Sequence, residues 1–206
     1  MERMSLSPRR EDDGTSTGPA GATAFPTELG WMAIRYRGGA VADLRFGYRS
    51  AREALAALGA RGEAPNTPPS AIARVIEQLV AYAQGRRVSF ERVKVDISGR
   101  TPFQARVVAA CRAVPYAEVL SYGDLARQVR CPGAARAVGN VMASNRVPII
   151  IPCHRVVGSG GRLGGFSAPG GIEVKARLLR LESGADELAP ATRPRRRVQR
   201  RLAGVA

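Results

Sequence analysis

The sequence is short of several residue types that mark particular classes of protein. Its 206 residues include one histidine, one tryptophan and three cysteines. Cys111, Cys131 and Cys153 are an odd number and lie far apart, which makes a poor disulfide framework and indicates a reducing compartment. There is no Cys-x-x-Cys pair, and one histidine leaves too few ligands for an ordinary zinc site. The sequence therefore predicts no metal.

Long apolar runs are absent as well. No stretch approaches the ~18 apolar residues that cross a membrane, and the N-terminus has no signal-peptide core. We therefore expect a cytoplasmic protein with no membrane partner. Lysine is almost missing, with only Lys94 and Lys175, so the net charge of +15 comes nearly all from arginine. Such a charge indicates a polyanionic partner, most simply nucleic acid.

The composition divides the chain into two tails and two ordered units. Residues 1–25 have almost no large apolar side chains, and residues 186–206 are rich in arginine. Both are expected to be disordered, and the second would add nonspecific affinity for phosphate. Between them, residues 26–98 are predicted to form an α+β domain and residues 99–185 a mostly helical domain.

The N-terminal unit is predicted to be a small antiparallel sheet with helices. Apolar residues alternate on both sides of a Gly-Gly pair, which indicates a β-hairpin over residues 30–47. Apolar residues at helical spacing predict an amphipathic helix over residues 70–84. Val93, Val95 and Ile97 alternate again and are expected to complete the sheet. No catalytic combination of side chains is visible here, so we expect a structural role.

A helix-turn-helix pattern occupies the middle of the C-terminal unit. Ser121 and Asp124 have the spacing of a variant capping box, and the helix that they begin ends near Val129. Cys-Pro-Gly at residues 131–133 breaks it, and a second helix is predicted over residues 134–144.

The outward face of this second helix carries small residues and one long cation. Long polar side chains that read a major groove are nearly absent, and small residues let the backbone approach DNA closely. Arg136 therefore suits a minor-groove approach in which arginine enters the base stack. An ordinary packed helix pair with a surface arginine remains the alternative. The apolar face carries Ala135, Val138 and Met142, and the outward face carries Arg136, Gly139, Asn140 and Ala143.

The only histidine, His154, directly follows Cys153, so histidine-assisted thiol chemistry has one possible location. Adjacent residues on regular structure point apart, so the pair needs an irregular backbone or a bridging water, and the water relay is the more natural geometry. The apolar segment between Pro148 and Pro152 is expected to cross the core in extended form and to bring Cys153 to the floor of a pocket.

The last helix offers a third group. Helical periodicity places Glu182 and Lys175 within its apolar arc. A buried carboxylate is costly without a partner, and His154 is the candidate. Glu182 would then orient the imidazole, and the pair would lower the pKa of Cys153 from ~8.5 toward neutrality. The alternative is a Cys-His pair that only happens to lie in a core.

These residues, in this order, resemble the O6-alkylguanine-DNA alkyltransferases, the methylated-DNA–protein-cysteine methyltransferases. The resemblance covers about residues 100–183, and its Pro-Cys-His-Arg-Val core is highly specific. It implies an RNase H-like N-terminal domain and a winged helix-turn-helix in the C-terminal domain. The matching motifs are Thr-Pro-Phe-Gln at 101–104, Val-Pro-Tyr at 114–116, Ser-Tyr at 121–122, Ala-Ala-Arg-Ala-Val-Gly at 134–139, Asn145, Ile-Pro-Cys-His-Arg-Val at 151–156, Gly-Gly-Phe at 164–166, Lys175, Leu-Leu at 178–179 and Glu182.

The resemblance implies DNA repair by a stoichiometric and irreversible transfer, without a cofactor. The alkyl group of O6-alkylguanine, and as a second candidate O4-methylthymine, would pass to Cys153. A monomer would bind double-stranded DNA through the minor groove and swing the damaged base into a pocket. Arg136 would fill the vacated space, with Ala135, Gly139 and Asn140 beside it on the DNA-binding helix.

The resemblance also implies roles around the base. Tyr122 would donate a proton or hydrogen bond to guanine N3 as charge develops. Asn145 would connect the predicted DNA-binding helix of residues 134–144 to the segment that carries Cys153. The carbonyl of Val156 would contact the exocyclic amine, and Phe166 and Ser167 would border O6.

The chain departs from the family pattern at several of these positions. Phe166 stands where many members have tyrosine, so a hydroxyl contact to the base is lost. Asn145 is followed by Arg146 in place of the usual proline. Ala168 and Pro169 lengthen the loop that borders the pocket, which would change the tolerance for bulky adducts.

Three other functions compete with alkyl transfer. A non-enzymatic binder that flags alkylguanine for another pathway would have lost the cysteine, which is present here. A helix-turn-helix regulator would need base-reading side chains and no inward glutamate. A cysteine hydrolase would need an oxyanion hole and repeated turnover.

Overall fold

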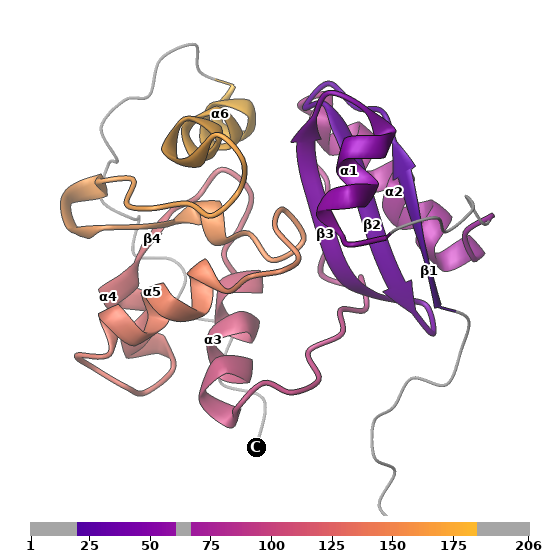
Figure 1. Cartoon of the computed structure of the whole chain (residues 1–206). Coiled ribbons are helices and arrows are strands. Elements are labelled where there is room, and N and C mark those ends of the chain that lie inside the picture. Colours follow the sequence, from indigo (N-terminus) through magenta and orange to yellow (C-terminus); the bar gives the residue numbers. More distant parts are fainter. Residues whose placement is uncertain (1–19, 61–66, 185–206) are drawn as a thin grey trace, which may run out of the picture.

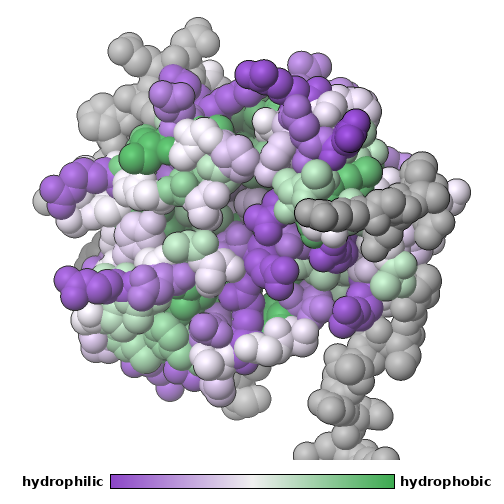
Figure 2. Space-filling model, viewed as in Figure 1, coloured by the Kyte–Doolittle hydropathy of each residue, from purple (hydrophilic) through white to green (hydrophobic). Residues whose placement is uncertain are grey.

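The computed structural model describes residues 20–60 and 67–184, and it places an N-terminal sheet unit beside a mostly helical C-terminal unit (Figure 1). The apolar core runs through both units without a break. On the face shown in Figure 2, hydrophilic residues gather in the hollow between the two units. The described residues contain no helix long and apolar enough to cross a membrane.

The N-terminal sheet is antiparallel, with strand order β1-β2-β3. The predicted hairpin is confirmed as β2, Trp31–Arg37, and β3, Ala40–Tyr48, joined by Gly38 and Gly39. Both glycines have positive φ, 53° and 77°, the conformation that a tight hairpin turn requires.

Helices cover the two faces of this sheet (Figure 1). The strand alternation directs Met32, Ile34 and Tyr36 into the main core together with the buried side of α2. This helix, Ser70–Ala83, confirms the predicted amphipathic segment. The opposite face carries small residues, such as Ala33, and packs against the shorter α1, Ala51–Ala57.

Two predictions for this unit were wrong. Strand β1, Ala20–Phe25, lies inside the stretch expected to be a disordered tail. Its small residues give no apolar alternation, and its order comes from pairing with β2. The segment around Val95 makes only a single bridge to Val41 in place of a strand, and Ile97 is 42% exposed. Residues 1–19 and the arginine-rich stretch after residue 184 lie outside the described residues.

The C-terminal unit begins with helix α3, Pro102–Arg112. A capping box between Thr101 and Gln104 forms the N-terminus of this helix. The next two predicted helices are present, as α4, Tyr122–Gln128, and α5, Ala135–Ala143. They pack against each other and against α3. Strand β4, Leu120–Ser121, pairs in parallel with β5, Val156–Val157, directly after the Cys-His sequence.

The apolar segment before Cys153 is buried but not extended, contrary to prediction. It turns twice, and Ile149 takes a left-handed φ of 70°. The Ile151 amide donates to the Val147 carbonyl at 2.9 Å and closes this turn. Neither flanking proline has a backbone N–H to donate. Residues Cys153–Arg155 then form one turn of 3-10 helix, and the last helix, α6, spans Gly171–Ser183.

Candidate active site

Cys153 lies at the start of the 3-10 turn and is 5% exposed. The irregular backbone is one of the two arrangements that the adjacent cysteine and histidine required. The Asn145 amide donates to the Cys153 sulfur at 3.1 Å and to the Ile151 carbonyl at 3.0 Å. Its own oxygen accepts from the Val147 amide at 3.0 Å. Asn145, just past the end of α5, therefore holds both the segment before Cys153 and the sulfur itself.

The predicted contact between His154 and Glu182 is confirmed. Nε2 of His154 lies 2.8 Å from Oε1 of Glu182, and neither side chain is exposed. The other ring nitrogen, Nδ1, is buried and has no hydrogen-bond partner among the described residues. The two ring nitrogens are thus in different environments, one against a carboxylate and one unpaired.

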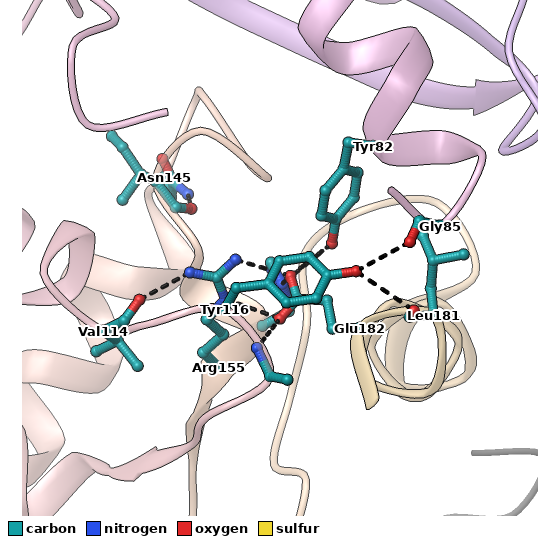
Figure 3. Close-up of polar contacts among 11 residues, drawn as sticks. Tyr82, Gly85, Val114, Tyr116, Asn145, Arg155, Leu181 and Glu182 are labelled. Carbon is teal, nitrogen blue, oxygen red and sulfur yellow. Dashed lines mark hydrogen bonds and ion pairs between the residues drawn. The ribbon is translucent and has the colours of Figure 1, made fainter. Parts of the chain in front are cut away.

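Arg155 pairs with the same carboxylate, which sequence reasoning did not foresee (Figure 3). Its Nε donates to Oε2 of Glu182 at 2.9 Å and its Nη2 donates to Oε1 at 2.9 Å. Its Nη1 donates to the Val114 carbonyl at 2.7 Å. The Ala117 amide also donates to Oε2, at 3.1 Å. The buried carboxylate therefore has a full set of donors, which is what keeps it charged.

Tyr82 reaches this network from the N-terminal unit. It lies on α2, is fully buried, and donates from its hydroxyl to Oε1 of Glu182 at 2.8 Å (Figure 3). The signal was present in the sequence, since Tyr82 follows Leu79 at helical spacing on the buried face. The prediction of a purely structural N-terminal unit overlooked it. Tyr116 packs edge-on against Tyr82 and lies under the Arg155 guanidinium, 5.7 Å from it.

The network keeps one of its two central groups charged and the other neutral. Burial alone would raise the pKa of Glu182, but hydrogen bonds and charge from His154 and Arg155 outweigh it and lower that pKa to about 2. Burial lowers the pKa of His154, only partly opposed by Glu182. The resting state therefore pairs a carboxylate with a neutral imidazole, which is able to accept a proton.

The expected lowering of the Cys153 pKa is wrong for the free protein. Burial raises the pKa of this thiol, and the Asn145 hydrogen bond and the Lys175 charge oppose the rise without cancelling it. The prediction weighed the neighbouring histidine and not the depth of the sulfur. The resting sulfur is therefore a thiol.

Lys175 lies on the buried side of α6, as its place in the apolar arc predicted. It is 0% exposed, and burial lowers its pKa to about 8. Its ammonium donates to the carbonyl of Val156 at 2.6 Å and to that of Leu163. It also lies 5.7 Å from the centre of the Tyr122 ring. Lys175 thus ties α6 to β5 and to the glycine-rich loop, and brings positive charge close to the sulfur.

A cavity of about 20 Å³ opens beside the sulfur. Asn145, Cys153, Phe166 and Ser167, all predicted site residues, line it. Tyr122 is half-buried at the start of α4, close enough to Gly164 for a Cβ there to lie 3.5 Å from its hydroxyl. The free space beside the sulfur holds about one water molecule.

Comparisons with known proteins place this site in a family. A family model described as 6-O-methylguanine DNA methyltransferase, DNA binding domain, matches residues 102–184. A methylated-DNA–protein-cysteine methyltransferase of Mycolicibacterium paratuberculosis is 45% identical over 114 residues, which cover 55% of this chain and 67% of that protein. The chain belongs to the methylated-DNA–protein-cysteine methyltransferase family.

Solved structures of this family match both units. The crystal structure of Mycobacterium tuberculosis OGT in complex with DNA has a TM-score of 0.64 and 36% identity, and the match covers 82% of this chain and 95% of that chain. The O6-methylguanine-DNA methyltransferase of Pyrococcus kodakaraensis has a TM-score of 0.61 at 25% identity, covering 79% and 99%. The small antiparallel sheet and the helical unit are therefore shared with the methyltransferase family.

Helix α5, which was predicted to bind DNA, contributes no residue to the buried hydrogen-bond network of His154, Arg155 and Glu182. On α5, Arg136 and Asn140 are exposed, and Val138 and Met142 are buried. Gly139 is half-buried, and a Cβ there would lie 4.0 Å from the Tyr122 ring. Helix α5 therefore packs close to Tyr122 at the start of α4.

Proposed function

We propose that this protein repairs DNA by transferring the alkyl group of O6-alkylguanine to Cys153, once per molecule and without a cofactor. The observation that carries the proposal is the Cys153 sulfur at a cavity wall, beside a neutral His154 held by a charged Glu182, in a chain of the methyltransferase family.

The reaction is an in-line displacement. A bond forms between the sulfur of Cys153 and the alkyl carbon while the bond from that carbon to O6 breaks. The thiol proton passes through a water to Nδ1 of His154, whose other nitrogen faces Glu182. The leaving guanine takes one proton from the Tyr122 hydroxyl, and the imidazolium proton then replaces it. The thioether product is not readily reversed, so each molecule acts once.

The surroundings favour the charges that develop during this step. Glu182 stabilises the imidazolium, as the carboxylate of a nucleophile–base–carboxylate set does. The Asn145 amide and the nearby Lys175 charge favour the thiolate over the resting thiol. Deprotonation therefore accompanies substrate binding, because the free protein holds the proton.

The remaining site residues act on the base. Tyr122 donates to guanine N3 as negative charge builds up on the leaving base. The Val156 carbonyl accepts from the exocyclic amine, and Lys175, which already donates to this carbonyl, fixes its direction. Phe166 and Ser167 border O6, and they line the same cavity as the sulfur.

Delivery of the base uses α5. The exposed Arg136 enters the duplex from the minor groove and fills the space of the flipped nucleotide, with Ala135, Gly139 and Asn140 against the DNA. In this proposal α4 and α5 are the helix-turn-helix of a winged domain, and the N-terminal unit is an RNase H-like domain. The protein acts in the cytoplasm as a monomer on double-stranded DNA.

Mass spectrometry after mixing with a duplex that contains one O6-methylguanine tests the proposal. We expect a gain of one methylene unit on the tryptic peptide of residues 147–155, saturating at one per protein. Cys153→Ala should abolish the gain and keep lesion binding, and Cys131→Ala, at the one cysteine that is only half-buried, should keep both. Tight lesion binding by the wild type without a mass gain would favour a lesion-flagging function.

A further inference from the structure

The N-terminal unit contributes a positively charged residue to the lining of the Cys153 cavity. Arg45 lies on β3 and lines the same cavity as Cys153, with Phe46 next to it and the loop of residues 166–169 across from it. Among the described residues that line this cavity, Arg45 is the only arginine, lysine, aspartate or glutamate. Its side chain is 34% exposed.

The charge of Arg45 is only partly compensated. Asp43, 2% exposed, lies 3.0 Å from Nε of Arg45 and 3.3 Å from Nε of Arg146. One carboxylate, Asp43, is therefore shared by two guanidinium groups, and Asp96 also interacts electrostatically with Arg146. Asp43 itself is not among the residues that line the cavity. Nη2 of Arg45 donates to Oδ2 of Asp43 at 3.2 Å, whereas Nε, although 3.0 Å from Oδ1, makes no hydrogen bond among the described residues.

The position of the Cys153 sulfur determines which part of a bound O6-alkylguanine comes close to Arg45. In the displacement, the reacting carbon lies against the sulfur of Cys153 with O6 directly beyond it. Atoms attached to that carbon must extend to the side, into the cavity between β3 and the loop. Pro148 and Phe166 supply apolar walls there, and Arg45 supplies the charge. The end of an alkyl substituent is therefore the part of the substrate that comes close to the guanidinium.

We propose that Arg45 makes this pocket selective for O6-alkyl groups that end in a carboxylate, such as O6-carboxymethylguanine. A carboxylate there would give the Arg45 guanidinium, which shares Asp43 with Arg146, an acceptor of its own. This inference rests on the proposed alkyl transfer.

The chemistry needs no further reactant. The sulfur of Cys153 bonds to the methylene carbon, the bond from that carbon to O6 breaks, and guanine takes up the proton. The carboxylate is unchanged, and the product is S-carboxymethylcysteine at position 153. Lys175 is the other cation near the sulfur, but its ammonium is occupied by two backbone carbonyls.

The test compares two duplex substrates of nearly equal shape, O6-carboxymethylguanine and its neutral amide, O6-carbamoylmethylguanine. Each second-order rate constant is divided by the same variant's rate with O6-methylguanine. We expect the wild-type protein to react about fivefold faster with the carboxylate than with the amide, as for a partly exposed charge pair. Arg45→Met should reduce this ratio to one or below, and Arg45→Lys should keep part of it.

Arg49→Met is the matched control, because it removes the same charge from an exposed position just past the end of β3. It should leave the carboxylate-to-amide ratio at its wild-type value. A wild-type ratio of one or less overturns the proposal, as does an equal loss in the Arg45 and Arg49 variants. Failure of methyl transfer itself would instead refute the proposed function, so the two outcomes are distinct.

Discussion

At the scale of single residues, the site depends on one carboxylate. Glu182 collects donors from α2, from the 3-10 turn and from the loop after α3, and each of them would be left unpaired without it. An uncompensated buried charge costs far more than a lost surface pair. Glu182 therefore stabilises the fold as well as the imidazolium proposed to form during transfer.

Replacing Glu182 should destabilise the protein in a pH-dependent way. Glu182→Gln leaves the Arg155 guanidinium buried without its counter-charge, and we expect a loss of about 3–5 kcal/mol in the free energy of unfolding at pH 7. The pKa of Glu182 is lowered to about 2 in the folded state, so its contribution is complete above its unfolded pKa, ~4.3, and is lost as pH falls toward 2. Denaturant unfolding at several pH values measures this. A gap between wild type and variant that stays constant down to pH ~2 would contradict the assignment.

At the scale of elements, Lys175 joins α6 to β5 and to the loop that borders the pocket. Lys175→Met would leave two carbonyl oxygens without their donor and would remove a charge that opposes the raised pKa of Cys153. We expect the pH midpoint of Cys153 alkylation by iodoacetamide, followed on the peptide of residues 147–155, to move higher. Arg180→Met changes an exposed cation on the same helix and should leave the midpoint in place. Equal shifts in both variants would show a general charge effect.

Helix α5 carries the proposed delivery of the base. Arg136→Ala should slow repair of duplex O6-methylguanine by about tenfold or more and should change the reaction with free O6-alkylguanine much less, because the free base does not have to be flipped. Paired rate measurements on the two substrates decide this. Arg106→Ala, at an exposed arginine on α3, is the control. Equal losses on both substrates would refute the flipping role.

At the scale of the whole molecule, the periodicity of the sequence predicted those features that are formed by residues close together in the sequence. The hairpin, helices α2, α4 and α5, and the inward direction of Glu182 all follow from periodicity and capping. The contacts of Tyr82 and Arg45 with the site did not, because they depend on how the N-terminal unit docks on the C-terminal one. The turn at Ile149 was missed because burial and apolar composition do not distinguish a strand from a buried loop.

The whole chain has a net charge of +15, and we expect this charge to govern binding to DNA. Each phosphate contact releases counterions, so the rate constant for duplex substrate at limiting concentration should fall at least about tenfold between ~50 and ~200 mM salt. The reaction with free O6-alkylguanine has no such release and should change little, since the Cys153 site is buried and screened weakly. Measuring both rates in one salt series separates the two steps. Parallel decreases would mean that salt acts on the buried network itself, and would remove the case for electrostatic binding of the phosphate backbone.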